Sequence, residues 1–582
     1  MGKIDTDRRS SICSAISLRH SLREIMPHPN DGQLVAPVVD FERRRVTPMR
    51  IVWTGGVIET IDPVDQDHDD GIDGVVTPGF IDSHIHIESS MLTPSRFAAA
   101  AIPHGTVATV SDPHEIANVC GVDGVRFMLD DARQSPLKCF FGAPSCVPAT
   151  TLETAGDSID AGQIASLLDH PEVLYLAEMM NWPGVLQRDP AVMTKIQSAI
   201  DRGLPVDGHA PSLAGQMAKD YFAAGITADH ECATIDEAIQ RIELGVIVQI
   251  REGSAARNFD ALWPLIDRYP GRVALCSDDK HPDELLVGHI NALCRRAVAL
   301  GCDVYNVLTA ACLVPIQHYR LPVGRLRVGD PADFVVLSDL ETFEVRQTYI
   351  DGVCQFSSRQ GDAPERPAEP TEPITAINRF AIGPKSIEDF RIQSNGKPNV
   401  RVIVAHDGLL TTTQTIQPGA TIDGRSVGDV TTDRLKITVV NRYAEQPPAM
   451  AWVRGFGLTS GALASSVAHD SHNIIAVAAD DDALLAAVNA VIEHRGGLSA
   501  VDAAGNVDVL PLPVAGLMSD RSCREVAEDY QRLDRTVKML GCPLRSPYMT
   551  LSFLALLVIP AIKLSDKGLF DAENFQFLDL QI

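Results

Sequence analysis

The sequence predicts an α/β fold, a (β/α)8 TIM-like barrel, for residues 76–321. Short apolar runs of strand length alternate there with longer segments of helical periodicity, at nearly regular spacing. The runs are nearly continuously apolar, as in parallel strands that are covered on both faces. Polar side chains follow the ends of several runs, the position where barrels of this kind carry their functional groups. The expected strands are the run that leads to His84 and residues 106–111, 138–141, 173–177, 204–207, 225–228, 246–250 and 273–276.

Helical crossovers are expected between these strands, most clearly at residues 190–202, 213–224 and 234–244. An open, doubly wound sheet is the rival arrangement, but it would place its first and last strands far apart. A closed barrel brings His84, near the first strand, beside Asp278, after the last one. We therefore prefer the closed barrel.

The flanks of the barrel region have a different character. Residues 35–75 and 322–356 are β-rich with Gly and Pro turns, and we expect them to pair as one small composite β domain. Residues 1–34 form an N-terminal extension, and residues 357–375, rich in Pro and Glu, indicate an exposed linker. Residues 376–582 alternate short strands and helices, which predicts an additional C-terminal α+β domain.

Composition narrows the classes of protein. A chain of 582 residues is too long for one core, and its net charge of −26 argues against a nucleic-acid surface. The 12 cysteines show no CxxC pair and indicate reduced thiols. The longest apolar run, residues 551–564, is interrupted by Pro560 and is too short to span a bilayer. We expect a cytoplasmic protein that handles small molecules without nucleic-acid or membrane partners, and a homodimer is compatible with the acidic surface.

Imidazole and carboxylate side chains at the strand ends predict a metal centre. In a strand His84 and His86 point to the same face, so two nitrogen donors lie close together. An isolated pair of this kind is more often without function, but here further donors follow. One divalent ion is expected between His84, His86 and Asp278 and a second between His209 and His230, with Glu178 as the bridge. Without thiolates, such donors suit Zn²⁺, Mn²⁺ and Fe²⁺ about equally.

These residues resemble the amidohydrolase superfamily, and five longer runs resemble the adenine deaminases of the bacterial type. The last run belongs to the C-terminal domain, so the resemblance extends from about residue 45 to the C-terminus. The superfamily motif alone is moderately specific, whereas all five runs in order are highly specific. The runs are residues 78–91 (PGFIDSHIHIESSM), 111–119 (SDPHEIANV), 207–211 (DGHAP), 276–282 (CSDDKHP) and 468–473 (AHDSHN).

The resemblance implies hydrolytic deamination of adenine to hypoxanthine and ammonia, a step of purine salvage, at a centre of two Fe²⁺ or Mn²⁺ ions. A hydroxide between the ions would attack C6 of the purine, with Asp278 as the base that passes a proton to the leaving amine. A second group must protonate or hydrogen-bond a ring nitrogen. Glu88 is the first candidate for this role, and Glu115 and His281 are further ones.

His469 and His472 lie in a polar turn before an apolar strand. By sequence pattern alone they are loop residues, whereas the resemblance makes them residues of a lid, of the substrate pocket or of an extra metal site.

Several neighbours have a structural alternative to a site role. His114, with Glu115, can cap the loop after the second strand, and Asp279 can begin a helix, because Asp is favoured at the N-cap. His281 can be a surface turn before a proline. Lys280 is expected to be solvated. Met180 and its neighbours form either an apolar wall for a purine or part of the core.

Two other functions remain open at this point. A cyclic amide hydrolase of the dihydroorotase or hydantoinase kind commonly bridges its metals with a carboxylated lysine, and Glu178 at that position disfavours it. The other is an inactive barrel that serves as a binding scaffold. Loss of a ligand would indicate a scaffold, and no expected ligand is missing.

Overall fold

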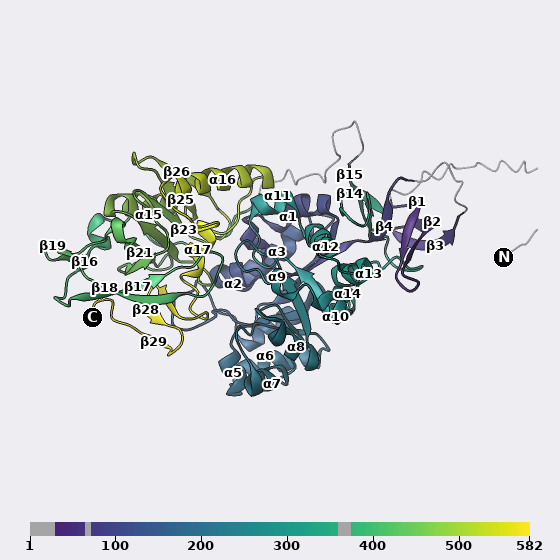
Figure 1. Cartoon of the computed structure of the whole chain (residues 1–582). Helices are drawn as coiled ribbons and strands as arrows, with labels where there is room; N and C mark the ends of the chain where they lie inside the picture. Colours follow the sequence, from purple (N-terminus) through teal and green to yellow (C-terminus); the bar gives the residue numbers. More distant parts are fainter. Residues whose placement is uncertain (1–29, 65–71, 359–373) are drawn as a thin grey trace, which may run out of the picture.

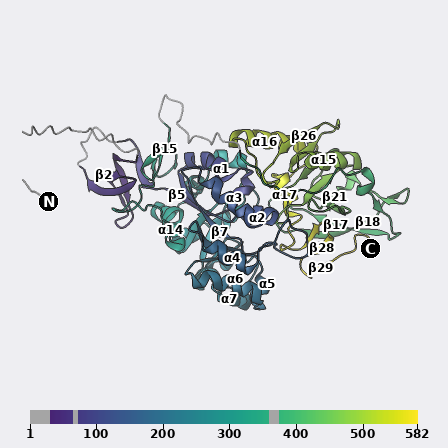
Figure 2. The ribbon, with the colours of Figure 1, turned by 180° about the vertical axis from the view of Figure 1, so that it is seen from behind.

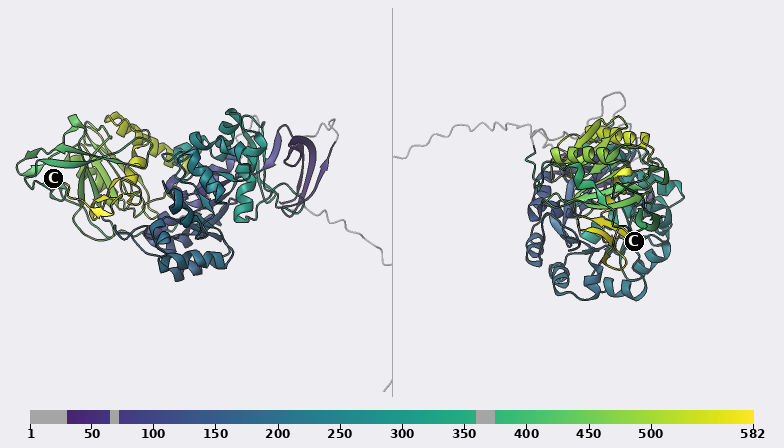
Figure 3. Two further views of the ribbon diagram at one scale, coloured as in Figure 1. Left: turned by 60° about the horizontal axis from the view of Figure 1, so that its bottom comes forward. Right: turned by 90° about the vertical axis from the view of Figure 1, so that its left-hand side faces the viewer.

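The computed structural model of the protein describes residues 30–64, 72–358 and 374–582. Residues 1–29 of the expected N-terminal extension and residues 359–373 of the expected linker lie outside the described part. The barrel occupies the middle of an elongated molecule, between a composite β sheet and the C-terminal domain (Figure 1). The views from behind and from below show the same order (Figures 2 and 3).

The barrel prediction is confirmed. Its eight strands follow one another in sheet order from β5 to β12, and neighbouring strands pair in parallel. The ring closes where the Asp278 N–H donates to the His84 carbonyl oxygen at 2.9 Å and Ser83 Oγ donates to the Leu275 carbonyl oxygen at 2.9 Å. The strands are β5 (Phe80–Ile85), β6 (Thr106–Ser111), β7 (Lys138–Ala143), β8 (Val173–Met179), β9 (Val206–Gly208), β10 (Ala228–Asp229), β11 (Ile247–Arg251) and β12 (Val273–Cys276).

Helices pack around this ring. The helix predicted at residues 234–244 is α8. At its start the Thr234 side chain accepts a hydrogen bond from the Glu237 N–H, and the Glu237 carboxylate accepts one from the Thr234 N–H. The helices are α1 (Pro94–Ala101), α2 (His114–Cys120), α3 (Val122–Ala132), α4 (Ala161–Leu168), α5 (Trp182–Leu186), α6 (Pro190–Asp201), α7 (Gly215–Phe222), α8 (Ile235–Glu243), α9 (Phe259–Leu262), α10 (Leu265–Arg268), α11 (Pro282–Val287), α12 (Ile290–Ala299), α13 (Val304–Leu308) and α14 (Val314–Tyr319), with short turns η1 (Ile87–Ser90), η2 (Ile102–His104) and η3 (Thr309–Leu313).

The composite sheet is built from both flanks, as predicted, but it takes one strand more than expected. The segment before Gly79 is β4, which pairs with β1 and β13 in this sheet, and the barrel begins only with β5. A boundary at residue 76 therefore cuts through β4. The strands are β1 (Gly32–Asp40), β2 (Arg45–Thr54), β3 (Val57–Pro63), β4 (Val75–Pro78), β13 (Phe334–Leu337), β14 (Val345–Ile350) and β15 (Val353–Ser357).

An ion pair fixes this sheet to the end of the barrel where the strands begin. Lys138, the first residue of β7, places Nζ 2.7 Å from Oδ2 of the buried Asp333. The opposite end of the barrel, where the strands finish, faces the C-terminal domain, since Glu115 after β6 contacts His469 there.

The C-terminal domain contains a second large sheet, of order β18-β17-β22-β21-β24-β23-β25-β26, with helix α15 packed against it. The connection from β23 to β24 reaches the barrel. The large sheet consists of β17 (Asn399–Val404), β18 (Thr413–Pro418), β21 (Leu435–Val440), β22 (Ala449–Arg454), β23 (Ala462–Ser465), β24 (Ile474–Ala478), β25 (Gly497–Val501) and β26 (Val507–Pro511). The smaller elements are η4 (Ile387–Phe390), β16 (Ile392–Gln393), β19 (Thr421–Ile422), β20 (Arg425–Ser426), η5 (Val430–Thr432), α15 (Asp481–Glu493), α16 (Cys523–Met539), α17 (Pro547–Phe553), β27 (Ile562–Ser565), β28 (Gly568–Asp571) and β29 (Gln576–Phe577).

Among the described residues, no helix combines the length and the apolar character that crossing a membrane requires.

Candidate metal centre and active site

The six predicted metal ligands converge at the end of the barrel where the strands finish. His84 and Glu178 lie within β5 and β8. His86, His209 and His230 directly follow the ends of their strands, and Asp278 lies two residues beyond the end of β12. All six side chains are buried. Among the described residues, their donor atoms fall into groups that could each hold an ion, including His84, His230 and Asp278 and, beside them, Glu178, His209 and His230.

His84, His86 and Asp278, the ligands predicted for the first ion, have the spacing of donors to a shared ion. Nε2 of His84 lies 3.2 Å from Nε2 of His86, and Oδ1 of Asp278 lies 3.3 Å from Nε2 of His86 and 3.7 Å from Nε2 of His84. Two donors that each lie about 2.1 Å from one tetrahedral ion are themselves about 3.4 Å apart. The residues present therefore fit a divalent cation at this position.

Glu178 faces both groups of ligands. Its Oε2 lies 2.9 Å from Nδ1 of His209 and 3.1 Å from Nε2 of His230, while its Oε1 lies 3.8 Å from Nε2 of His86. The His84 and His230 rings stack with their centroids 4.0 Å apart, so the two groups are adjacent. This arrangement agrees with Glu178 as a bridge between two ions, and the donor chemistry, nitrogen and oxygen without sulfur, suits divalent metals.

The surroundings keep the two carboxylates ionised. Burial by itself raises the pKa of Glu178, but His209 and His230 outweigh it and hold the pKa well below its usual range. Burial likewise opposes ionisation of Asp278, and Arg251 and His86 hold its pKa well below the usual range. Both groups are thus available as anionic ligands at neutral pH.

Arg251 and Glu231, two charged residues that the sequence did not single out, contact the candidate ligands. Arg251 Nη1 lies 2.6 Å from Oδ2 of Asp278 and 2.7 Å from Oε1 of Glu231. Glu231 in turn lies 3.3 Å from Nε2 of His230. The available signals were the position of Glu231 next to His230 and that of Arg251 at the end of an expected strand, but neither residue type is diagnostic there.

The start of α2, which follows β6 closely, also enters the site. Nδ1 of His114 lies 3.2 Å from Oδ2 of Asp112 and 3.5 Å from Oε1 of Glu178. The sequence left His114 equally open to a capping role, and the structure places it against the metal ligands.

The residues after Asp278 differ from their structural expectations. Asp279 accepts a hydrogen bond from Ser89 Oγ at 2.5 Å, and the N-cap of α11 is His281 rather than Asp279. Lys280 is buried, not solvated, and burial lowers its pKa. The His281 ring packs edge-on against Tyr530 at 4.6 Å, and burial lowers its pKa to about 4.

The C-terminal domain contributes the buried His469 and His472 to the site. Nδ1 of His469 lies 2.5 Å from Oε1 of Glu115, and Nε2 of His472 contacts the other oxygen of that carboxylate. Glu115 follows β6 in the barrel, so this cluster joins the two domains. Among these residues Glu115, His469 and His472 form a further group of donor atoms within reach of one another.

A small cavity of about 30 Å³ lies over the ligands. The C-terminal domain covers it with Leu410, Phe553 and Leu556, and His469 also lines it. Glu88 lies outside the lining, where its Oε1 accepts the Ile116 N–H at 3.2 Å and burial raises its pKa to about 7.

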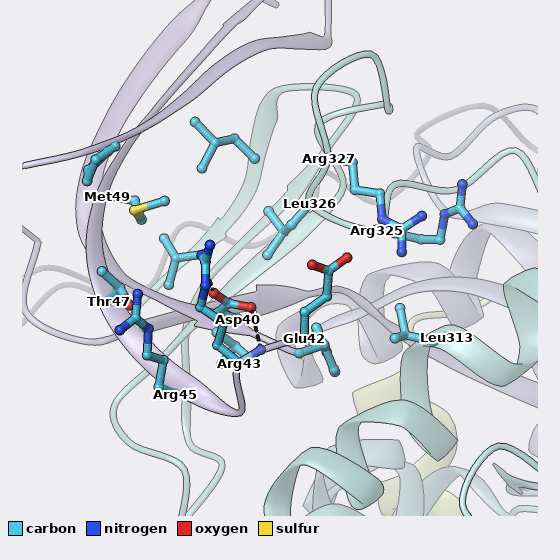
Figure 4. A pocket seen from close by; sticks show the side chains of 15 residues that line it. Asp40, Glu42, Arg43, Arg45, Thr47, Met49, Leu313, Arg325, Leu326 and Arg327 are labelled. Carbon is cyan, nitrogen blue, oxygen red and sulfur yellow. Dashed lines mark hydrogen bonds and ion pairs between the residues drawn. The ribbon is translucent and has the colours of Figure 1, made fainter.

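A second cavity, of about 350 Å³, lies at the composite sheet, and none of the six candidate metal ligands lines it (Figure 4). Arg43 and Arg45 line one side of it and Arg325 and Arg327 another. Arg43 is hydrogen-bonded to Asp40 at 3.2 Å, and most of these guanidinium groups are open to solvent.

Comparison with known proteins identifies the family. Over 556 residues, 95% of this chain and 99% of the relative, the sequence is 50% identical to an adenine deaminase from Salinibacter ruber. The chain belongs to the adenine deaminase family. Another adenine deaminase, from Methanosarcina barkeri, is 47% identical over 93% of this chain and 98% of its own length. A third, from Borreliella burgdorferi, is 41% identical over 94% of this chain and 99% of its own.

The family models agree with this adenine deaminase assignment. The amidohydrolase family model matches residues 75–354, and the model of the adenine deaminase C-terminal domain matches residues 409–576. A solved N-acetyl-D-glucosamine-6-phosphate deacetylase from Mycobacterium smegmatis aligns with 55% of this chain and 99% of its own, at 17% identity and a TM-score of 0.44.

Proposed function

We propose that this protein hydrolyses adenine to hypoxanthine and ammonia, as a step of purine salvage. The observation that carries the proposal is the set of six buried donors under a C-terminal domain, in a chain that matches adenine deaminases over nearly its whole length. When bound, two divalent ions would lower the pKa of a water molecule and so supply the nucleophile at neutral pH. We propose Mn²⁺ or Fe²⁺ for this role, with Zn²⁺ as the alternative.

In this proposal His84, His86 and Asp278 would hold one ion and His209 and His230 the other. Glu178 would serve both ions, because its two carboxylate oxygens face the two groups of imidazoles separately.

Asp278 is the proposed base. It removes a proton from the attacking water and returns one to the departing amine. Arg251 holds its Oδ2, so the carboxylate is oriented with Oδ1 toward the histidines. Because hydrogen bonds already hold the carboxylate in place, little entropy has to be lost to orient it for proton transfer.

Substrate entry requires movement of the covering side chains. A cavity of about 30 Å³ holds only one or two water molecules, much less than a purine ring. Leu410, Phe553 and Leu556 form its apolar cover, so we propose that the C-terminal domain shifts at these positions to admit adenine. Closure over the substrate then excludes bulk water from the site.

The remaining features of the proposal concern the whole molecule. We propose a cytoplasmic homodimer, without nucleic-acid or membrane partners, divided into the composite β domain, the barrel, the linker and the C-terminal domain. Cys120, Cys139, Cys146 and Cys276 are free thiols, as a reducing compartment would keep them. Light scattering of the purified protein tests the dimer, since a mass of one chain would refute it.

The test of the reaction is a substrate panel, with ammonia release as the signal for deamination and loss of the substrate by chromatography as the signal for ring opening. Adenine, guanine, dihydroorotate and hydantoin are offered to the same preparation at equal concentration. We expect release from adenine to exceed the others by at least tenfold. Ring opening of a cyclic amide without adenine turnover would favour the dihydroorotase-like alternative, and no turnover at all would favour the scaffold.

A further inference from the structure

We propose that His469 is a catalytic residue of the C-terminal domain, whose Nε2 protonates the purine N1 while Glu115 orients the ring. The inference rests on the proposed adenine deamination and assigns the ring acid that this reaction needs. It is carried by the arrangement of hydrogen bonds around Glu115, which determines where each imidazole proton lies.

The argument begins with His472, whose tautomer is fixed by the backbone. The Ala468 N–H donates to Nδ1 of His472 at 3.2 Å, so Nδ1 is the acceptor nitrogen of a neutral ring. The proton therefore lies on Nε2, which donates to Glu115 Oε2. A metal ion bound at this Nε2 would displace the proton that the ring donates to Glu115. The cluster is therefore better explained by hydrogen bonds than by an extra ion.

Glu115 in turn fixes His469. Its second oxygen, Oε1, lies 2.5 Å from Nδ1 of His469, and an ionised carboxylate only accepts, so Nδ1 carries a proton. Burial raises the pKa of Glu115, but His469, His114 and His472 hold it well below its usual range, so the carboxylate is ionised. This is the carboxylate–imidazole pair that enzymes use to orient an acid–base histidine.

The other nitrogen of His469 is left for the substrate. Within the described chain, Nε2 of His469 has no hydrogen-bond partner although the side chain is only 2% exposed. Buried polar atoms are nearly always paired, so an orphan of this kind requires an explanation. His469 lines the cavity over the metal ligands, and its ring stacks on Phe553 with centroids 4.8 Å apart at 19°.

The charge around His469 favours a proton donor. Burial alone would lower its pKa, but Glu115 and Asp279 raise the pKa to about 9, so the ring is an imidazolium at neutral pH. Among the other ring-acid candidates, Glu88 and His281 do not line the cavity within the described residues. Glu115 lines it, but both of its oxygens are engaged by histidines.

The step balances as follows. The water oxygen forms a bond to C6 and gives one proton to Asp278, while the C6–N1 π electrons move to N1, which takes the proton from His469 Nε2. The Asp278 proton then passes to the amine, the C6–N bond breaks, and ammonia leaves. The hydroxyl proton at C6 goes to solvent through Asp278, and His469 regains one from solvent. The N1 proton remains in hypoxanthine.

The test compares His469→Gln and His469→Asn with wild type in the metal-loaded full chain. Gln can place an N–H near the position of Nε2 but is no acid, and Asn keeps the Glu115 contact with nothing at that position. We expect kcat for adenine to fall about 10²- to 10⁴-fold, more for Asn than for Gln, with KM within a few-fold and two metals retained. His494→Gln, at the exposed end of α15, is the control and should match wild type.

Glu115→Gln provides the second measurement. If Glu115 acts through His469, the double variant with His469→Gln should be no slower than the slower single variant, because residues that act as a unit are not additive. A kcat within tenfold of wild type in both His469 variants, or a loss explained entirely by KM or by metal content, would overturn the inference. Wild-type protein without adenine turnover would instead refute the proposed function.

Discussion

Replacement of Glu178 by glutamine tests the bridging role most sharply. Gln has the same shape but replaces one anionic oxygen with an NH₂ group, which repels a cation. The lost charge faces Nδ1 of His209 at 2.9 Å, Nε2 of His230 at 3.1 Å and Nε2 of His86 at 3.8 Å, so it serves both groups of ligands. We therefore expect the protein to bind one of the two ions much more weakly.

The magnitude follows from the position of Glu178 among the donors. Loss of an outer partner of a metal ligand costs about 10–100-fold in metal affinity or activity. A carboxylate that itself contacts both groups should exceed the upper end of that range, which corresponds to about 3 kcal/mol or more.

The assay for Glu178→Gln combines metal analysis by mass spectrometry with adenine turnover and circular dichroism. We expect one metal per chain instead of two, turnover reduced by more than about 100-fold, and an unchanged spectrum. Glu243→Gln, at an exposed position of α8, is the matched control and should keep both metals and full activity. Two metals and full turnover in Glu178→Gln would show that the bridge is misassigned.

Three further predictions concern stability and substrate access. Arg251→Met leaves Glu231 and Asp278 without their buried partner, so urea denaturation should show a loss of about 3–5 kcal/mol; a loss below 1 kcal/mol would contradict this. Burial lowers the pKa of Lys563 to about 7, so the unfolded state binds more protons between about pH 7 and 10, and the free energy of unfolding should rise with pH there. Lys563→Met should flatten that rise, and equal slopes in both proteins would refute it. Leu556→Ala enlarges the covered cavity and should raise kcat/KM for N6-methyladenine relative to adenine severalfold. An unchanged ratio would show that Leu556 does not limit the space for the substrate.

The sequence predicted the barrel well because its strands are nearly continuous apolar runs. Two of the expected strands, 106–111 and 273–276, agree with β6 and β12 residue for residue, whereas β9 and β10 begin two or three residues later than expected. The sequence boundary at residue 76 placed most of β4 (Val75–Pro78) with the barrel. Pairing with β1 and β13 decides its place, and pairing is not encoded locally.

The convergence of the six candidate ligands was predictable because their residue types are unusual at the ends of buried strands. The supporting charges were not, because a Glu beside a His or an Arg after a strand is ordinary on a surface. Lys280 shows the same limit: it is buried in the folded chain, although its polar sequence neighbours predicted a solvated side chain. The contact of His469 with Glu115 joins positions 354 residues apart and needed the folded domains.

The most direct test of the central claim is a metal titration of apo-protein with adenine as substrate. Protein stripped with a chelator is reconstituted with Mn²⁺, and conversion to hypoxanthine is followed by ultraviolet absorbance, with ammonia release as a check. The account predicts that turnover is absent without metal and rises to a plateau at two ions per chain. Hypoxanthine formation by the metal-free protein, or no adenine turnover with two ions bound, would contradict it.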